Sequence, residues 1–132
     1  GQIMWEYCEM SRNEEGLRKA IKMIAELREE YYRDLFVPGT QDEFNPELEK
    51  AARVADFLEL GELFAVDALH RNESCGGHFR EEYQTPEGEA LRDDENFTFV
   101  SAWEWTDTTK EPTLHKEELI FDNVELKTRS YK

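Results

Sequence analysis

The stretch EEGLRKAIKMIAELREEYYRDL, residues 14–35, carries the clearest structural pattern in the chain. Its apolar residues recur at steps of three and four, the spacing of one face of an α-helix: Leu17, Ala20, Ile21, Ile24, Leu27, Tyr31 and Leu35. We therefore predict an amphipathic helix over 14–35. Either a capping box of Ser11 and Glu14 or the side chain of Asn13 would begin this helix, and Pro38-Gly39 would end it.

A second long helix is predicted after the loop PGTQDEFN, residues 38–45. Asn45 before Pro46 is typical of a helix start, because Asn caps the free N–H groups and proline suits the first helical position. We expect this helix to run to about Asn72, with these apolar positions: Leu48, Ala52, Ala55, Leu58, Phe64, Ala65, Ala68 and Leu69. Because residues 54–69 are apolar on more than one face, we expect them to be buried between neighbours.

Residues 2–10, QIMWEYCEM, place Met4, Trp5 and Cys8 at helical spacing and resemble the end of a further helix. The chain starts at Gly1 without Met, which we interpret as a remnant of expression and a cut within a longer protein. Three helices joined by short connections predict a mainly α fold, an antiparallel three-helix bundle over residues 1–72.

The pattern changes after the bundle. Residues 73–93 are Gly-containing and charged, without helical periodicity. Residues 97–105 are aromatic and β-branched and alternate in polarity, and residues 113–126 alternate in part, which indicates a β-hairpin or two extended segments. We therefore expect residues 73–132 to form a loop and an extended C-terminal arm, within one structural domain together with the bundle.

The charge balance excludes several classes of function. The chain has 132 residues, with 31 acidic and 16 basic side chains and a formal net charge of −15. Binding to nucleic acid or to an anionic membrane needs a basic surface, so neither is expected. Direct membrane insertion is not expected either, because no apolar run approaches the roughly 20 residues that a spanning helix needs. Two cysteines are too few for a disulfide framework and favour a reducing compartment.

Cys75-Gly-Gly-His78 is the first candidate for chemistry, since it brings a thiol and an imidazole close in sequence. A zinc site needs two further ligands, and His70 and His115 are the available histidines. A Cys/His nucleophilic pair is a second alternative. The pattern favours a third, a tight turn in which Gly76 and Gly77 supply positive φ.

Two further groups are candidate interface or polar-network residues. His78, Arg80 and Glu81 combine an imidazole, a guanidinium and a carboxylate in one short run, as a buried polar network, an interface or a carboxylate site would. Trp103 and Trp105 would face the same way on a strand, which favours the core or a subunit contact over a binding platform. No phosphate loop or nucleophile elbow is present in the sequence.

Several of these segments, taken in order, resemble the C-terminal domain of the succinate dehydrogenase and fumarate reductase flavoproteins. Residues 73–83, ESCGGHFREEY, are similar to that family's E-S-R-G-A-H-x-R-E-D-Y segment, although Cys75 replaces the family's Arg and Gly77 its Ala. Further similar segments lie along the chain, namely residues 13–17, 24–30, 45–49, 58–60, 92–97 (RDDENF) and the terminal 129–131 (RSY).

This resemblance implies a spectrin-repeat-like three-helix bundle followed by an extended arm. It also implies that FAD and all catalytic residues lie upstream, so that no catalytic, cofactor-binding or metal-binding residue is assigned in this chain. The domain would pack on the flavin-binding domain of the same polypeptide and dock an iron–sulfur subunit, with the membrane anchor contacted indirectly. The parent protein would interconvert succinate and fumarate on the cytoplasmic side, peripheral to the inner membrane, and pass electrons to iron–sulfur clusters and a quinone.

Three alternatives remain open at this stage. L-aspartate oxidase shares the implied architecture and a similar E-S-R-G segment, so it is a second possible parent. The chain could also be a free-standing helical interaction module, or a small enzyme or metal protein built on Cys75 and His78.

Overall fold

The computed structural model describes residues 1–40, 42–107 and 110–127. The chain forms two compact units, Gly1–His70 and Arg71–Lys132, and each is described separately below. The first unit is helical and the second contains a small antiparallel sheet, so the fold is mixed, with mainly helical residues at the N-terminal end. Within the described ranges, no helix combines the length and apolar character that crossing a membrane requires.

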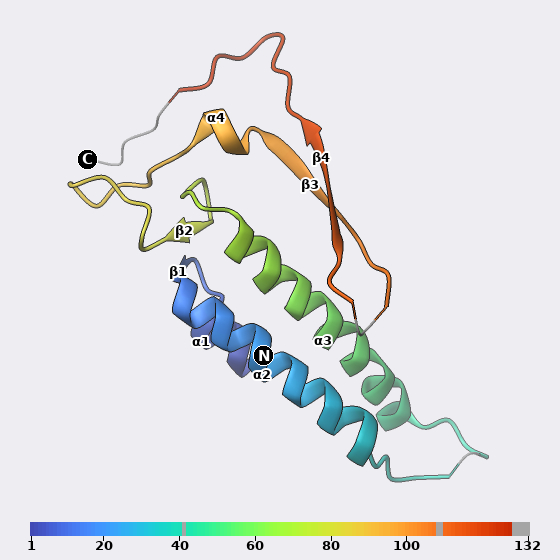
Figure 1. Cartoon of the computed structure of the whole chain (residues 1–132). Helices are drawn as coiled ribbons and strands as arrows, with labels where there is room; N and C mark the ends of the chain where they lie inside the picture. The colour runs from blue at the N-terminus through green and yellow to red at the C-terminus, as the bar shows by residue number, and fades with distance from the viewer. Residues whose placement is uncertain (41, 108–109, 128–132) are drawn as a thin grey trace. The chain divides into compact units, whose positions relative to one another are not determined.

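The first unit is built on two long helices, α2 (Glu14–Asp34) and α3 (Pro46–His70), which lie side by side and antiparallel (Figure 1). A short helix, α1 (Gln2–Tyr7), and the two-residue strand β1 (Ser11–Arg12) precede α2. The predicted first helix over residues 2–10 is therefore shorter than expected. The two long helices agree with the prediction, whereas the third helix of a bundle is reduced to six residues.

Side-chain caps define where both long helices begin. Asn13 Oδ1 accepts a hydrogen bond from the Gly16 amide at 2.8 Å, so Asn13 caps α2 and the alternative capping box of Ser11 and Glu14 was wrong. Asn45 Oδ1 accepts from the amide of Glu47 at 3.1 Å, as its position before Pro46 predicted. The helix α2 ends at Asp34, one residue before the predicted end at Leu35, whose ψ of 122° is no longer helical.

Small residues line the contact between the helices. The core consists of Cys8, Leu17, Ala20, Ala65 and Ala68, all of them buried, and α1 adds partly buried side chains to it. An ion pair of Arg28 with Glu62 and a 2.8 Å hydrogen bond from the Tyr31 hydroxyl to the Ala51 carbonyl continue the same seam toward the far end of the helices. The small core residues allow the two backbones to approach closely, and the polar bonds fix their register.

Part of the predicted core is exposed instead. Ala65 and Ala68 are buried as expected, but Leu35 and Phe64 are exposed. The prediction that residues 54–69 would be buried on more than one face was therefore wrong for this chain, because among the described residues of the first unit α2 is the one long helix that packs along α3. The second apolar face of α3 remains open to solvent in the structure.

The second unit begins with a series of hydrogen-bonded turns, which include the two-residue strand β2 (Phe79–Arg80). The amide of Thr85 donates to the carbonyl of Glu89 at 2.8 Å, and Gly88 adopts a φ of 82° in the turn between them. A single-turn helix, α4 (Asp94–Phe97), follows and is capped by Asp93, whose side chain accepts from the Asn96 amide at 3.2 Å. This helix was absent from the sequence prediction because four residues are too few to show a periodicity.

Strands β3 (Phe99–Glu104) and β4 (Thr113–Glu118) form the antiparallel hairpin that the alternating pattern predicted. Phe99 pairs with Glu118 at one end of the ladder and Glu104 with Thr113 at the other. The second strand ends well before residue 126, because beyond Leu119, whose amide donates to the Thr98 carbonyl at 3.2 Å, its partners would be residues 94–97, which belong to α4. The terminal RSY segment, residues 129–131, lies outside the described residues.

Candidate functional site

A tight turn at residues 75–78 lies near the start of the second unit. The amide of Cys75 donates to the carbonyl of His78 at 2.8 Å, and the amide of His78 donates back to the carbonyl of Cys75 at 3.1 Å. Gly76 has a φ of 60°, whereas Gly77 has no positive φ, so the expectation of positive φ was right for the first glycine only. Positive φ at the first central residue alone is the pattern of a type II′ turn. The turn therefore accounts for glycine at position 76.

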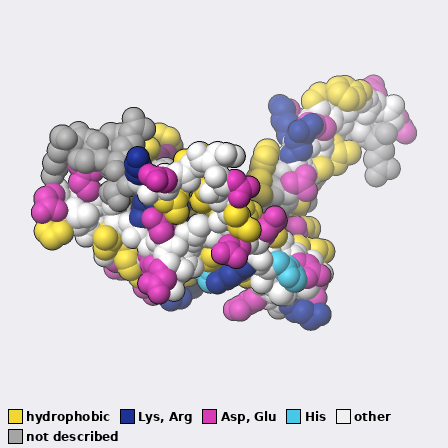
Figure 2. Space-filling model, turned by 90° about the horizontal axis from the view of Figure 1, so that it is seen from above, with side chains coloured by type: hydrophobic (Ala, Val, Ile, Leu, Met, Phe, Trp, Pro, Cys, Tyr) yellow, Lys and Arg dark blue, Asp and Glu magenta, His cyan; other side chains and the backbone are white. Residues whose placement is uncertain are grey.

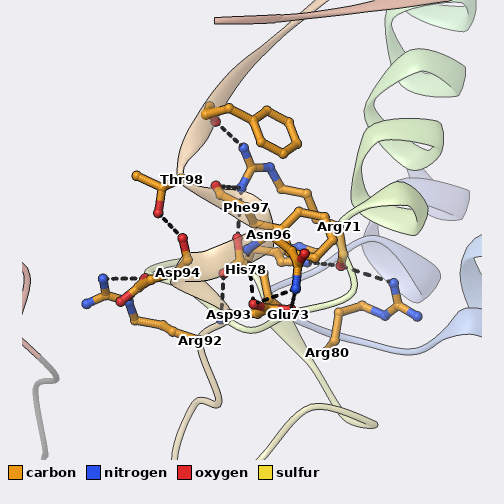
Figure 3. A network of polar contacts seen from close by, with 11 residues as sticks. Arg71, Glu73, His78, Arg80, Arg92, Asp93, Asp94, Asn96, Phe97 and Thr98 are labelled. Carbon is orange, nitrogen blue, oxygen red and sulfur yellow. Dashed lines mark hydrogen bonds and ion pairs between the residues drawn. The ribbon is translucent and has the colours of Figure 1, made fainter. Parts of the chain in front are cut away.

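Arg71 lies at the centre of a polar network that starts at the end of α3 (Figure 3). Its Nη1 donates to Glu73 Oε1 at 2.8 Å and to the Phe97 carbonyl at 3.2 Å, and its Nη2 donates to the Phe99 carbonyl at 2.6 Å. The guanidinium also lies 5.0 Å from the centre of the Phe99 ring. One side chain thus holds both the end of α4 and the start of β3.

Glu73 is the anionic partner in this Arg71 network and is only 3% exposed. Its second oxygen, Oε2, accepts a hydrogen bond from the amide of Asp93 at 3.2 Å. Both oxygens of the carboxylate are therefore used, one by a cation and one by the backbone just before α4. A buried carboxylate needs such partners, because burial without them is costly.

His78 and Arg80 extend the network on the other side of Arg71 (Figure 3). His78 Nε2 lies 3.0 Å from the Arg71 carbonyl, and since a carbonyl oxygen only accepts, Nε2 carries the proton. Arg80 is 1% exposed, and its Nη1 donates to the same carbonyl at 3.4 Å. Ser74 Oγ accepts from the Arg80 amide at 2.8 Å and donates to the Arg80 carbonyl at 3.1 Å. Arg80 Nε also reaches Glu82 Oε2, at 3.1 Å.

A second, more exposed pair lies beside this network. Arg92 donates to Asp94 Oδ1 through Nη2 at 2.6 Å and through Nε at 2.9 Å. The hydrogen bond with Asp94 raises the pKa of the Arg92 guanidinium above its usual value, and partial burial acts in the opposite direction. Arg92 Nη1 also donates to the carbonyl of Lys127 at 3.0 Å, which ties the end of the described chain to α4.

The remaining predicted site residues are placed as follows. Cys75 is an exposed thiol, and Glu81 is an exposed carboxylate whose backbone carbonyl accepts from Gln84 Nε2 at 2.7 Å. Trp103 lies on β3 opposite Leu114 and is half-buried. Trp105 lies beyond the end of β3 and is 59% exposed, so the two indoles do not share one strand face. In the part of the chain that the structure describes, no group of three or more His, Cys, Asp or Glu side chains could hold a metal ion.

The structure thus brings His78 and Arg80 together around Arg71, whereas sequence reasoning missed Arg71, Glu73 and Asp93 as network members. A charged pair two residues apart at the end of a helix, Arg71 and Glu73, was the available signal. This pair does not stand out in the sequence, because charged pairs at similar spacing, such as those along α2, are exposed. Asp and Glu side chains are also spread among hydrophobic ones over the face seen in Figure 2.

These features define a helical unit followed along the chain by a hairpin unit whose base is held by the half-buried Arg71. Comparison with known proteins gives the family. Residues 1–131 match the family described as "Fumarate reductase flavoprotein C-term", and the chain belongs to this family of C-terminal domains of fumarate reductase and succinate dehydrogenase flavoproteins.

Individual relatives agree with the family. The chain is 32% identical to the fumarate reductase flavoprotein subunit of Helicobacter pylori over 128 residues, which cover 95% of this chain and 17% of that protein. It is 35% identical to the corresponding subunit of Escherichia coli over 97 residues, 74% of this chain and 15% of that protein. A relative from Methanocaldococcus jannaschii, described as an uncharacterized FAD-dependent oxidoreductase, is 33% identical over 82 residues, 62% of this chain and 14% of that protein.

Solved structures agree as well. The FrdA chain of a mutated Escherichia coli quinol fumarate reductase superposes with a TM-score of 0.80 at 30% identity, covering 96% of this chain and 21% of that one. A quinol–fumarate reductase with menaquinol molecules gives a TM-score of 0.76, also at 30% identity, covering 93% of this chain and 20% of that one. The chain therefore spans about one fifth or less of the length of the proteins that it matches.

Proposed function

We propose that this chain serves as the C-terminal domain of a flavoprotein subunit that interconverts succinate and fumarate. The observation that carries the proposal is the match of residues 1–131 to the fumarate reductase C-terminal family. The relatives' names support the same reaction, since the matched subunits of Helicobacter pylori and Escherichia coli are fumarate reductase flavoproteins. In the parent protein, electrons would pass from FAD to an iron–sulfur subunit and a quinone.

FAD and the reacting groups belong, in this proposal, to the upstream part of the polypeptide. The glycine pair at 76–77 supports this division, because it forms a turn that leads into a short strand, β2, and not into a helix. A dinucleotide-binding loop needs a helix N-terminus directly after its glycines to receive the pyrophosphate. The role of this domain is then to pack on the flavin domain and support assembly.

The fold of the domain in the parent protein is proposed to be an antiparallel three-helix bundle, with α1 as its third helix. Three partly buried side chains of α1, namely Ile3, Met4 and Tyr7, pack against the core formed by α2 and α3, and this supports the arrangement. The complex would be peripheral to the membrane, and this domain would contact the membrane anchor only through other subunits.

The Arg71 network has a structural role in this proposal. By holding the end of α4 and the start of β3, it fixes the base of the hairpin that carries Trp103, while Trp105 projects just beyond the strand. Aromatic side chains are enriched in protein interfaces, and Trp105 is exposed. We infer that Trp103 and Trp105 form part of the surface that docks the iron–sulfur subunit.

The reaction is tested on the complete protein from the source organism. An antibody raised against this chain should detect a band several-fold heavier than 15.6 kDa, enriched with membranes. The complex captured with that antibody should contain FAD and reduce fumarate with a reduced viologen dye as electron donor. A band at the chain's own mass in the soluble fraction, or a captured complex that oxidises L-aspartate and leaves fumarate unreduced, would contradict the proposal.

The docking surface is tested by replacing both tryptophans. Trp103→Ala with Trp105→Ala in the complete flavoprotein should reduce co-purification of the iron–sulfur subunit and leave bound FAD unchanged. Tyr32→Ala is the matched control, since Tyr32 is an equally exposed aromatic residue on α2. Unchanged co-purification in the double variant, or an equal loss in the control, would remove the proposed interface.

A further inference from the structure

The helix α3 exposes a second apolar face. Phe57, Leu60 and Phe64 follow a spacing of three and then four residues, so they form one stripe along about two turns of the helix. Phe57 is 65% exposed, Leu60 64% and Phe64 49%. Val54, one turn earlier, is also exposed. We call these four residues the α3 stripe.

The α3 stripe is distinct from the face that packs on α2. The buried residues of α3 are Leu58, Ala65 and Ala68, of which the two alanines belong to the core, and Glu62 pairs with Arg28 of α2. Gly61, at the border of the two faces, lies close to Met4 of α1 and Ile24 of α2. The stripe therefore begins where the packed face ends, and its side chains have no apolar neighbour among the helices of the first unit that would bury them.

Two arginine side chains lie near the α3 stripe. Arg53 lies on the same side of the helix and is engaged by Glu49, and the guanidinium of Arg12 lies 5.4 Å from the centre of the Phe64 ring. The stripe thus has an arginine near each end, and the charge of one of them, Arg53, is balanced by Glu49. A partner would meet these residues with an apolar surface.

The size of the stripe discriminates between possible partners. A fully exposed phenylalanine side chain presents on the order of 200 Å², so the four residues, at 41–65% exposure, together expose roughly 400 Å² of apolar surface. A stable dimer of free chains buries about 800 Å² on each partner. The stripe is therefore too small to hold a second copy on its own, whereas a partner on the same polypeptide is held at high effective concentration and needs far less contact area.

Such a partner is available if the proposed function is correct, and this inference rests on it. The chain spans 14–21% of the proteins that it matches, so most of a relative's polypeptide lies outside it. We propose that the α3 stripe, Val54, Phe57, Leu60 and Phe64, is the seat on which an apolar surface of the upstream flavin-binding part of the same polypeptide packs.

The experiment is site-specific photo-cross-linking in the complete flavoprotein. Phe57, and in a second variant Phe64, is replaced by p-benzoylphenylalanine, and cross-linked peptides are identified by mass spectrometry. The same replacement of Lys22, an exposed residue of α2, is the matched control. Because a tethered contact is nearly always formed, we expect cross-links from both phenylalanine positions to upstream peptides of the same chain, in roughly tenfold higher yield than from Lys22.

Bound FAD and fumarate reduction are measured on the same samples before irradiation. If both are present but the Phe57 and Phe64 positions cross-link to a second copy, to residues 71–132 or to another subunit, the inference is wrong and the proposed function stands. If the protein is active but Phe57 and Phe64 cross-link no better than Lys22, the inference is likewise wrong and the proposed function stands. If the complete protein neither holds FAD nor reduces fumarate, the proposed function itself fails, and an upstream cross-link would then show only an interdomain contact of another kind of protein.

Discussion

Replacing Arg71 should destabilise the second unit more than any other single loss of an ion pair in the described chain. Arg71→Met keeps the length and the apolar stem of the side chain but removes the guanidinium, which makes hydrogen bonds to Glu73, Phe97 and Phe99. Glu73 would then lose its cationic partner in a site that is 3% exposed. Removing one partner of a buried ion pair costs about 3–5 kcal/mol, and this is the expected loss in free energy of unfolding.

A second substitution separates the part of this stability loss that comes from the unpaired Glu73 from the part that comes from the lost hydrogen bonds. In Arg71→Met with Glu73→Gln, the stranded charge is gone, while the glutamine carbonyl can still accept from the amide of Asp93. We expect the double variant to recover about 1–3 kcal/mol relative to Arg71→Met alone. Arg71→Lys should lie between wild type and Arg71→Met, because an ammonium cannot fork to Glu73 and two carbonyls in the same geometry.

The assay is urea unfolding of this chain, followed by tryptophan fluorescence in a Trp5→Phe background, so that the signal comes from Trp103 and Trp105 in the second unit. The control is Arg18→Met, which makes the same chemical change in the exposed pair with Glu14. That pair is worth only about 0.3–0.5 kcal/mol. A loss below about 1 kcal/mol for Arg71→Met, or a double variant no more stable than the single one, would refute the claim that a buried charge holds the hairpin base.

Three further predictions concern single positions. Gly76→Ala should cost about 1 kcal/mol in urea unfolding because Gly76 has a φ of 60°, whereas Gly77→Ala should change stability by less than about 0.5 kcal/mol, since Gly77 has no positive φ and open space around it. Burial raises the pKa of the Cys8 thiol above its usual 9.0, with Arg12 acting in the opposite direction. The unfolded chain then loses the thiol proton first, so the free energy of unfolding should fall as pH rises past 9.0, and Cys8→Ala should remove that part of the fall. Leu17→Ala should cost about 2–5 kcal/mol, because Leu17 is fully buried among the core residues, and a thermal unfolding curve that does not shift would contradict its central place there.

The long helices and the hairpin could be predicted from sequence because each is defined by local patterns. Leu17, Ala20 and Ile24 recur at helical spacing and are buried, and the alternation after Phe97 became the β3 strand. Local patterns were misleading where a partner decides burial. Phe57 and Phe64 look like core positions by periodicity, yet the helices of this chain leave both exposed.

The polar network was only half visible from sequence for a different reason. His78 and Arg80 stood out because they lie beside the glycine turn, but nothing local distinguishes Arg71 from the many arginines that pair in solvent on α2 and α3. Its importance comes from three acceptors, of which two are carbonyls at residues 97 and 99. Such long-range pairing with backbone groups follows from the path of the chain and leaves no pattern in residue types.

The division into two compact units bears on how fast the chain folds. In each unit the main pairing joins elements that are neighbours in sequence: α2 with α3 through the loop at residues 35–45, and β3 with β4 through the loop at residues 105–112. Closing such short loops costs little chain entropy, and hairpins of either kind form within microseconds. Low contact order of this kind favours rapid folding. We therefore expect each unit to fold early and at its own rate.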